Sequence, residues 1–382
     1  MRTLSGSINT AIVYTVERSD AQIDCYAESQ IINLCSLEAM AGSRIRIMPD
    51  VHAGVVCPIG FTSTVAQNIM PVMIGTDAGC GVTTVKITRG RADWRKLDTV
   101  IREQIPAGAQ VRSRRSGFAG ELNFDELVCL KHIRTQKAEL ALGTLGGGNH
   151  FIEVETDGDD LYLTVHSGSR SAGRELFEHY MAAGRKELAA RGIEIPYELT
   201  WISGALKDDF LHDLALVCEY ARHNREIILQ EIMKGMKWKG ERFISCIHNY
   251  VDDRAETVSL CGAPVVRKGA VSAQIGETVI IPINMRDGVI IGTGLGNTDW
   301  NCSAPHGAGR LLKRSDTAGR ISMDSYRREM NGIYCSCISR ETLDESPEVY
   351  RGVEEISAAV AGNVKVEKIL RPVYCFKAGA SD

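Results

Sequence analysis

Hydrophobic and polar positions along the chain follow two kinds of pattern. Four long segments rich in alanine, leucine and charged residues repeat their apolar positions at helical spacing, and a weaker segment of this kind follows Ser339. They predict α-helices over residues 91–104, 121–142, 172–191 and 207–236. Short runs rich in β-branched residues lie between these segments and predict β-strands. The runs occupy residues 11–16, 70–75, 82–87, 161–166, 243–248 and 278–292.

The order of these elements indicates the fold class. Helices do not alternate regularly with strands, as they do in a doubly wound parallel sheet, so we expect an α+β protein. No internal repeat, linker or low-complexity tract interrupts residues 1–382, which favours a single domain.

Composition changes this picture little. The 382 residues are 44% hydrophobic and 24% charged, fractions that exclude a disordered or fibrous protein. No stretch approaches the ~20 apolar residues of a membrane helix, and no apolar run of a signal peptide precedes Arg18. We therefore expect a cytoplasmic protein with no membrane partner.

The net charge of −4 says little about partners. A nucleic-acid partner would depend on a local basic patch or on bound metal ions, because the chain as a whole is slightly acidic. Arg112, Arg114 and Arg115 form the dense basic run, for which a solvated loop is favoured over a phosphate site.

The twelve cysteines are the unusual count. They are scattered and form no CxxC pair, which favours reduced thiols over a disulfide framework or a zinc ribbon. Cys335 and Cys337 are separated by one serine, which is too close for a usual structural zinc site. Most of these thiols are expected to be small buried apolar side chains.

Candidate chemistry begins with the histidines. Imidazoles that stand at strand ends beside Asp, Asn or Ser indicate a metal site or an acid–base site. Five of the nine histidines lie in such segments, namely His52, His150, His166, His248 and His306. The other four lie in helical patterns among charged residues, where solvated or capping roles are expected; they are His132, His179, His212 and His223.

The segment IGTDAGCGV adds Asp77 and Cys80 on a glycine-rich turn. One thiolate can bridge two divalent ions, and a carboxylate with imidazoles can complete their coordination. This mixed set of O, N and S donors suits Mn, Zn, Co or Fe better than Mg or Ca. The same spacing is equally compatible with a turn-forming aspartate and a buried cysteine.

Two glycine-rich loops, LGTLGGGNHF and APHGAGR, offer successive backbone N–H groups to an anion. Neither matches a Walker loop or a dinucleotide fingerprint. Because His306 lies in the second loop, the pattern raises the hypothesis that this imidazole attacks phosphorus.

Together these segments resemble the RtcB family of RNA-splicing ligases. The matching pieces are MPDVHAG, IGTDAGCGV, LGGGNHFIEV, VHSGSRSAG, the HN of IHNYVD, RKGAV and HGAGR, in the family's order between residues 48 and 310. Lys377 in YCFKAG also fits. The resemblance implies the family's own α+β fold, a central β architecture flanked by helices, as one catalytic domain over residues 1–382.

The resemblance also implies an activity. RtcB ligases depend on GTP and two Mn²⁺ ions, and they join RNA 3'-phosphate or 2',3'-cyclic phosphate ends to 5'-hydroxyl ends through a guanylylated histidine. The implied roles are RNA repair and tRNA processing in the cytoplasm. RNA with such ends is then the partner, an activating protein is a further one, and the chain is expected to be a monomer.

The family motifs assign roles to residues of this chain. His306 matches the guanylylated nucleophile, Asp50 a supporting carboxylate, and Arg170 a phosphate-binding side chain, whereas His52 is interpreted as structural. The resemblance places Asp77 and His150 on one metal ion, His166 and His248 on the other, and Cys80 between them. The residues implied in nucleotide binding are Asn149, His150, Phe151, Ile152, Glu153, Arg170, His248, Asn249, Pro282, Ile283, Asn284, Met285, His306, Gly307, Ala308, Gly309 and Lys377.

One segment departs from the family pattern. The family usually has PGSMG before the nucleophile, where this chain has PINMRDG, so Ile283 and Asn284 replace small residues. Val289 stands where the family often has a serine near the base. We expect a narrower base pocket and altered guanine contacts. Two alternatives therefore stay open: a binuclear-metal hydrolase that acts on cyclic phosphate ends without ligation, and a non-catalytic RNA-binding relative.

Overall fold

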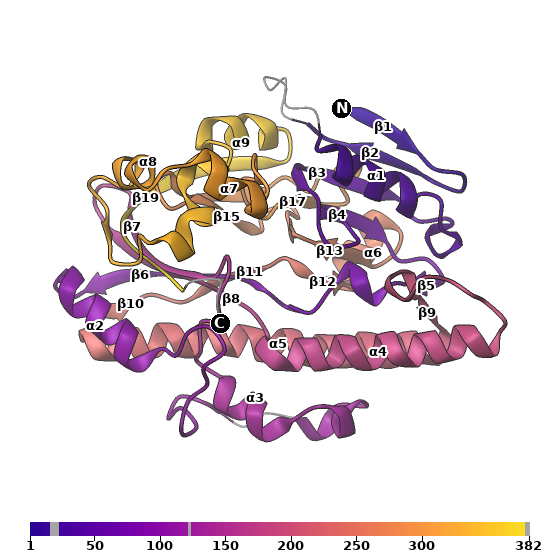
Figure 1. The fold of residues 1–382 in the computed structure, drawn as a ribbon, viewed down its shortest axis with the longest axis horizontal. Coiled ribbons are helices and arrows are strands. Elements are labelled where there is room, and N and C mark those ends of the chain that lie inside the picture. The colour runs from indigo at the N-terminus through magenta and orange to yellow at the C-terminus, as the bar shows by residue number, and fades with distance from the viewer. Residues whose placement is uncertain (16–22, 121–123, 379–382) are drawn as a thin grey trace.

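The computed structural model describes residues 1–15, 23–120 and 124–378, and Figure 1 shows their arrangement. Across these residues two large β-sheets, mostly antiparallel, carry the fold. The first has the order β1-β2-β3-β4-β13-β12, and its strands are β1 (Arg2–Ser5), β2 (Thr10–Val13), β3 (Ile45–His52), β4 (Ile59–Thr64), β13 (Val265–Lys268) and β12 (Asn249–Asp252).

The second sheet has the order β10-β6-β8-β7-β19-β16-β15. Its strands are β10 (Lys239–Gly240), β6 (Gly81–Arg89), β8 (Leu161–Ser167), β7 (Phe151–Thr156), β19 (Val364–Lys377), β16 (Gly288–Gly294) and β15 (Thr278–Asn284). Two short strands join it at the side, β11 (Ile244–Ile247) on β6 and β18 (Tyr334–Cys335) on β19. Two-stranded ladders pair β14 (Ala270–Ser272) with β17 (Ser303–Pro305), and β5 (Asn68–Ile69) with β9 (Ile202–Ser203).

Helices lie on both sides of these sheets (Figure 1). The long helices α4 (Arg170–Ala190) and α5 (Gly204–Met236) run along one side, with α2 (Trp94–Gln104) and α3 (Thr135–Ala141) near them. On the opposite side lie α7 (Arg314–Arg320), α8 (Met323–Glu329) and α9 (Val353–Val360). Two further helices, α1 (Cys25–Leu34) and α6 (Ala255–Cys261), accompany the first sheet.

Helix α5 connects the two main hydrophobic cores. Its N-terminal half contributes Phe210, Leu214 and Val217 to the core that includes the first sheet. Its C-terminal half contributes Ile228 and Ile232 to the core beneath the second sheet. These apolar positions recur every three to four residues, so one stripe of the helix stays buried along its length. The helix ends at Lys237, which adopts a left-handed conformation with φ 58°.

The α+β class predicted from the sequence is confirmed, and most predicted elements are present. The helices predicted over 91–104, 172–191 and 207–236 correspond to α2, α4 and α5. Strands β2, β6, β8, β11, β15 and β16 correspond to the predicted β-branched runs, although residue 16 of the first run lies outside the described residues. The weak helical pattern after Ser339 corresponds to a 3₁₀ helix at Arg340–Glu345 followed by α9.

Two predicted elements were wrong. Residues 70–75 form a 3₁₀ turn at Pro71–Met73 instead of a strand, because Pro71 begins the turn and lacks the N–H that a ladder needs. The helix predicted over 121–142 is present only as α3, preceded by 3₁₀ turns in its described part. There the buried Asp213 of α5 accepts hydrogen bonds from the backbone of Val128 and Cys129, and this tertiary contact replaces helical bonds.

Among the described residues, no helix combines the length and the apolar character needed to cross a bilayer.

Candidate metal centre and its cavity

Four strand ends meet at one edge of the second sheet. The antiparallel register pairs Gly81 at the start of β6 with Ser167 at the end of β8 and with Ile247 at the end of β11. It also pairs Phe151 at the start of β7 with His166 of β8. Since neighbouring antiparallel strands run in opposite directions, the start of one lies beside the end of the next. Residues next to these four ends therefore gather in one place.

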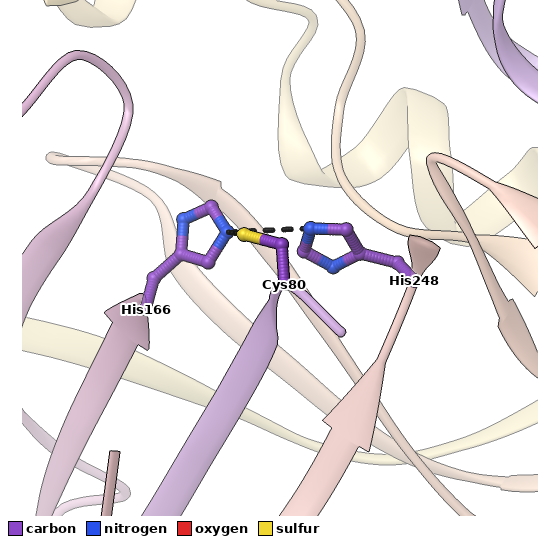
Figure 2. Close-up of side chains that lie close together, drawn as sticks. All are labelled: Cys80, His166 and His248. Atoms are coloured by element: carbon purple, nitrogen blue, oxygen red, sulfur yellow. Dashed lines mark hydrogen bonds between the residues drawn. The ribbon is translucent and has the colours of Figure 1, made fainter. Parts of the chain in front are cut away.

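The gathered side chains are a thiol, three imidazoles and a carboxylate. The Cys80 Sγ atom lies 3.4 Å from Nε2 of His150 and 3.3 Å from Nε2 of His166. Nε2 of His166 lies 3.4 Å from Nε2 of His248, and Figure 2 shows Cys80 and these two rings pointing toward one another. An oxygen of Asp77 lies 3.1 Å from Nε2 of His150.

These atoms form two groups that share the sulfur. Cys80, His166 and His248 make one, and Asp77, Cys80 and His150 make the other, with ligand atoms within 4.8 Å of one another in each. Asp77 is partly exposed, whereas the other four residues are buried. The first group offers sulfur and nitrogen donors and the second adds an oxygen, a mixed set that suits borderline divalent ions.

The outer ring nitrogens are already engaged by the backbone. Nδ1 of His150 donates to the carbonyl oxygen of Leu145 at 2.8 Å, and Nδ1 of His166 donates to that of Asn149 at 3.1 Å. A proton on Nδ1 leaves Nε2 as the free lone pair, and Nε2 is the atom that faces the sulfur. This orientation is typical of histidines that hold metal ions.

Burial sets the protonation of these groups. Burial lowers the pKa of His166 and His248 well below the usual value, and the neighbouring imidazoles lower it further. Burial also raises the pKa of the Cys80 thiol, and the Asp77 carboxylate adds to this. Burial alone would raise the pKa of Asp77, but its hydrogen bond with His150 holds that pKa below its usual value. The imidazoles of His166 and His248 are thus neutral, whereas a metal ion must displace the proton of Cys80.

Helix α5 supports the loops that carry these residues. Its fully buried Arg225 donates to the carbonyl oxygens of Gly79 at 2.8 Å and Ser167 at 2.9 Å, directly beside Cys80 and His166. The neighbouring Asn224 accepts from the backbone N–H of Gly143 at 2.7 Å and donates to the carbonyl of Gly168 at 3.1 Å. Sequence reasoning did not find these two residues. The feature that could have revealed them is a pair of adjacent polar residues on the apolar face of a predicted helix.

Two glycines allow the close approach of these loops. Gly146 has φ 83°, and a Cβ there would lie 1.9 Å from a guanidinium nitrogen of Arg170 and 2.7 Å from Nδ1 of His150. A Cβ on Gly168 would lie 1.9 Å from the carboxylate of Asp77. Any larger residue at either position would displace a side chain of the cluster.

His306 lies beside the cluster, on the loop that follows β17. Its ring centroid is 4.8 Å from that of His248, and its Nδ1 lies 2.7 Å from Oδ2 of Asp50 on β3. Asp50 is fully buried, and its other oxygen has no hydrogen-bond partner among the described residues. The carboxylate therefore fixes the ring with Nε2 as its unengaged nitrogen. His52 stacks on His306 from further away, with centroids 6.5 Å apart.

A cavity of about 950 Å³ opens next to His306. Most residues that the resemblance implied in nucleotide binding line it, namely Asn149, Phe151, Glu153, Pro282, Ile283, Asn284, Met285, His306, Gly307, Ala308, Gly309 and Lys377. His166 also faces it, which joins the cavity to the metal-capable cluster. The volume falls in the range of cofactor and nucleotide pockets.

Buried charges occupy the wall around Lys377. Its Nζ lies 2.6 Å from the carboxylate of Glu345 and 5.6 Å from the ring centroid of Phe151. Glu345 also accepts from Tyr350 at 2.7 Å and from Arg310 at 3.3 Å. Burial alone would lower the pKa of Lys377, but Glu345 and Tyr350 hold it above its usual value, so the lysine is charged. Arg310 ends the HGAGR motif, whereas no local motif in the sequence marks Glu345 or Tyr350 as members of this wall.

Five of the residues implied in nucleotide binding lie outside the cavity lining. Ile152 is fully buried in the core beneath the second sheet. His248 belongs to the cluster, and Asn249 holds the nearby loops by donating to the Asp77 carbonyl at 3.1 Å. Arg170 donates to the hydroxyl of Thr144 at 3.2 Å and to the carbonyl of Gly108. His150, which was implied in both roles, also belongs to the cluster.

The departing segment PINMRDG forms the end of β15 and the turn after it. Ile283 is buried and lines the cavity, as the expected narrowing requires. The amide of Asn284 instead serves its own turn: its oxygen accepts from the backbone N–H of Asp287 at 2.8 Å. Val289 is fully buried among apolar side chains and does not line the cavity.

Arg112, the first residue of the basic run, has a structural role. Arg112 donates to the carbonyls of Leu142 and Gly143, both at 2.9 Å, and lies 3.5 Å from the carboxylate of Glu231. These contacts fasten the loop before the cluster to α5.

Comparison with known proteins gives a consistent picture. A family model described as tRNA-splicing ligase RtcB matches residues 30–126 and 118–378. The RNA-splicing ligase RtcB of Escherichia coli K12 is 30% identical, with 93% of this chain and 95% of that protein covered. The RNA-splicing ligase RtcB of Mycobacterium tuberculosis is 24% identical, with 91% of this chain and 100% of that protein covered. The tRNA-splicing ligase RtcB of Pyrobaculum aerophilum is 23% identical, with 85% of each chain covered.

Proposed function

The chain belongs to the RtcB family, and on this basis we propose that it is an RNA ligase. In this proposal it uses GTP to join RNA 3'-phosphate or 2',3'-cyclic phosphate ends to 5'-hydroxyl ends, in RNA repair or tRNA processing. The observation that carries the proposal is the position of His306. A buried carboxylate orients this imidazole, and it stands between a metal-capable cluster and a nucleotide-sized cavity.

The cluster fits a pair of Mn²⁺ ions by its donor chemistry. Asp77 and His150 would hold one ion, His166 and His248 the other, and the Cys80 thiolate would bridge them. The support is the shared sulfur in the two groups and the Nε2 atoms turned toward it. Such ions, when bound, supply positive charge to a triphosphate and hold its leaving group in line.

His306 would be the nucleophile. Its Nε2 attacks the α-phosphorus of GTP; an N–P bond forms, the bond to the bridging oxygen breaks, and pyrophosphate leaves. The imidazole gains positive charge as this bond forms, and Asp50 at 2.7 Å from Nδ1 stabilises that charge. Asp50 thus acts as a positioning residue.

The cavity would hold the nucleotide. Backbone N–H groups of residues 307–309 suit its phosphates, since glycine-rich turns present such groups together. Phe151, Glu153 and Lys377 lie on the wall where the base would sit. Ile283 would narrow the base pocket, so the preference of this chain for guanine is to be tested separately.

Two later steps complete the proposed reaction. An oxygen of the RNA 3'-phosphate attacks the phosphorus on His306, which frees the imidazole and leaves the guanylate on the RNA end. The 5'-hydroxyl of the second RNA then attacks the 3'-phosphate phosphorus, a phosphodiester bond forms, and GMP leaves. A cyclic phosphate must first be opened by water to enter this sequence. The cytoplasmic location, the monomeric state and an activating protein stay predictions.

The first test measures the covalent adduct. Protein incubated with Mn²⁺ and GTP labelled at its α-phosphate should become labelled, and the label should be absent in His306→Ala. His212→Ala, on α5 and outside the cavity lining, is the matched histidine control and should label normally. Labelling of His306→Ala would contradict the nucleophile assignment. The same assay with ATP, CTP and UTP measures base preference.

A second assay separates ligase from hydrolase. RNA with a 2',3'-cyclic phosphate end and RNA with a 5'-hydroxyl end are mixed with and without GTP. Joined RNA only when GTP is present supports the ligase. Conversion to 3'-phosphate ends without joining, at the same rate with and without GTP, would instead identify a metal-dependent hydrolase.

A further inference from the structure

Three thiols gather at the end of the second sheet, behind the cavity wall. Strand β18 pairs in parallel with β19, and this register places Cys335 opposite Cys375. The sulfur atoms of Cys335 and Cys337 lie 3.2 Å apart. Cys375 is fully buried and donates its S–H to a carboxylate oxygen of Glu153 at 3.2 Å. Cys335 and Cys337 are only half-buried, so small solutes reach them.

Within this thiol cluster of Cys335, Cys337 and Cys375, the first two residues form a reactive pair. A hydrogen bond from the Cys337 thiol, with the positive charge of Lys377 nearby, lowers the pKa of the Cys335 thiol below its usual value. A thiolate is the form that reacts with oxidants and disulfides. Cys337 holds the adjacent thiol in contact with it.

A metal site explains these thiols less well. Among the described residues, the two groups of three metal-capable atoms that converge within 4.8 Å both contain Cys80, and neither contains a member of the thiol cluster. Cys337 also accepts a hydrogen bond from the backbone N–H of Lys377 at 3.2 Å. Redox chemistry between two adjacent sulfurs needs no further ligand.

We propose that Cys335 and Cys337 form a reversible disulfide that closes in response to peroxide. The Cys335 thiolate attacks the peroxide, takes one oxygen to become a sulfenic acid and, with a proton, releases water. The Cys337 thiol then attacks that sulfur, and the S–S bond forms as a second water leaves. A dithiol reductant restores both thiols by exchange.

The disulfide would act on the cavity through Lys377. Closing the bond brings the two sulfurs from 3.2 Å to the ~2.05 Å of a disulfide, and it removes the proton of Cys337, the sulfur that the backbone N–H of Lys377 contacts. Lys377 lines the cavity and pairs with Glu345 at 2.6 Å. Oxidation should therefore weaken nucleotide binding, a consequence that rests on the proposed function, whereas the disulfide itself does not.

Peptide mapping tests the bond without reference to activity. The Mn²⁺-loaded protein is treated with hydrogen peroxide, its remaining thiols are blocked, and it is digested with trypsin. Cleavage after Arg328 and Arg340 yields a peptide of residues 329–340 that contains both cysteines. We expect this peptide to be lighter by two hydrogens and to regain them with dithiothreitol. Two blocked thiols in this peptide, or a link to the peptide of residues 369–377 that carries Cys375, would overturn the proposal.

Nucleotide affinity tests the consequence. GMP, which lacks a pyrophosphate leaving group, is titrated into reduced and oxidised Mn²⁺-loaded protein by calorimetry. We expect about tenfold weaker binding after oxidation, of the order of one lost hydrogen bond. Cys337→Ser should bind equally under both conditions, and Cys25→Ser, which removes the exposed cysteine of α1, should respond as the unchanged protein does.

The outcomes separate two kinds of failure. Weakening that persists in Cys337→Ser would point to oxidation of another thiol, such as Cys80, and would overturn the role of the pair. No GMP binding by the reduced protein would count against the proposed nucleotide site, while the mapped disulfide would still stand.

Discussion

At the scale of single residues, Asp50 links the buried interior to His306. It is fully buried, one oxygen holds Nδ1 of His306 at 2.7 Å, and the other has no partner among the described residues. A buried carboxylate with one unsatisfied oxygen lowers the free energy of unfolding, which points to a functional role for this residue. In the proposed reaction, that role is to orient the ring and to stabilise the positive charge that the ring gains when it attacks phosphorus.

We predict that Asp50→Asn slows formation of the guanylate adduct by about a hundredfold or more, because the amide cannot stabilise the imidazolium. The rate of labelling from α-labelled GTP, followed across pH, measures this. Binding of GMP should change little, since Asp50 does not line the cavity. Asp93→Asn, which retains a capping side chain at the start of α2 and lies outside the cavity lining, is the matched control. Equal loss of GMP affinity and rate would indicate a merely structural role.

At the scale of elements, the strand pair β12–β13 carries a buried ion pair. Arg267 is fully buried and donates to a carboxylate oxygen of Asp252 at 2.6 Å. The two residues lie on paired strands. Strand β13 is followed by β14, and β14 pairs with β17, the strand that His306 follows. Breaking such a pair by removing one partner leaves a buried charge uncompensated.

We predict that Asp252→Asn lowers the free energy of unfolding by about 3 kcal/mol, measured by urea denaturation near neutral pH. The exposed neighbour Asp253→Asn should change it little. If both substitutions have equal effects, the ion pair contributes nothing specific.

The pH dependence of this difference follows from the pKa of Asp252. Burial alone would raise it, but Arg254 and Arg267 hold it below its usual value in the folded protein. A depressed pKa contributes stability above the unfolded value of ~3.9 and loses it as the pH falls toward the folded value. The difference between the two proteins should therefore be constant above about pH 5 and shrink in more acid solution.

At the scale of the whole molecule, the metal-capable cluster draws on segments far apart in the chain. Asp77, Cys80, His150, His166 and His248 stand next to four strands of one sheet, and Asn224 and Arg225 of α5 hold their loops. The unfolded chain does not bring these atoms together. Metal ions held by this cluster would therefore favour the folded protein over the unfolded one. We also propose that the chain is one domain, since α5 contributes to both main cores.

We predict that Mn²⁺ stabilises the protein, by about 2.7 kcal/mol at a concentration a hundred times its dissociation constant. Thermal unfolding with and without Mn²⁺ measures the shift in Tm, and EDTA should reverse it. Cys80→Ser should lose most of the shift, whereas Cys25→Ser should retain it. An equal shift in all three proteins would mean that Mn²⁺ acts elsewhere on the surface.

Much of the candidate site could be predicted from the sequence, because its members stand in short motifs. Cys80 and Asp77 share one glycine-rich turn, and His166 and His248 each end a predicted β-branched run, whereas His150 stands in the glycine-rich motif before β7, a strand that was not predicted. Glu345 and Arg225 could not be predicted in this way, since they lie in ordinary 3₁₀ and α-helical segments whose importance comes only from what they contact. Residues 124–134 show the same limit for the fold, because Asp213 accepts the backbone hydrogen bonds of Val128 and Cys129 there.

The sequence by itself determined the class of fold, the kinds of donor atom and the turns that carry them, because periodicity, glycine placement and motif spacing act over a few residues. Only the tertiary structure decided that Cys80 lies 3.3 Å from His166 and that Asp50 holds His306 across 256 positions of chain. Those distances depend on strand register and on packing against α5. Such contacts join segments that are far apart in the chain, and no pattern within a few residues can predict them.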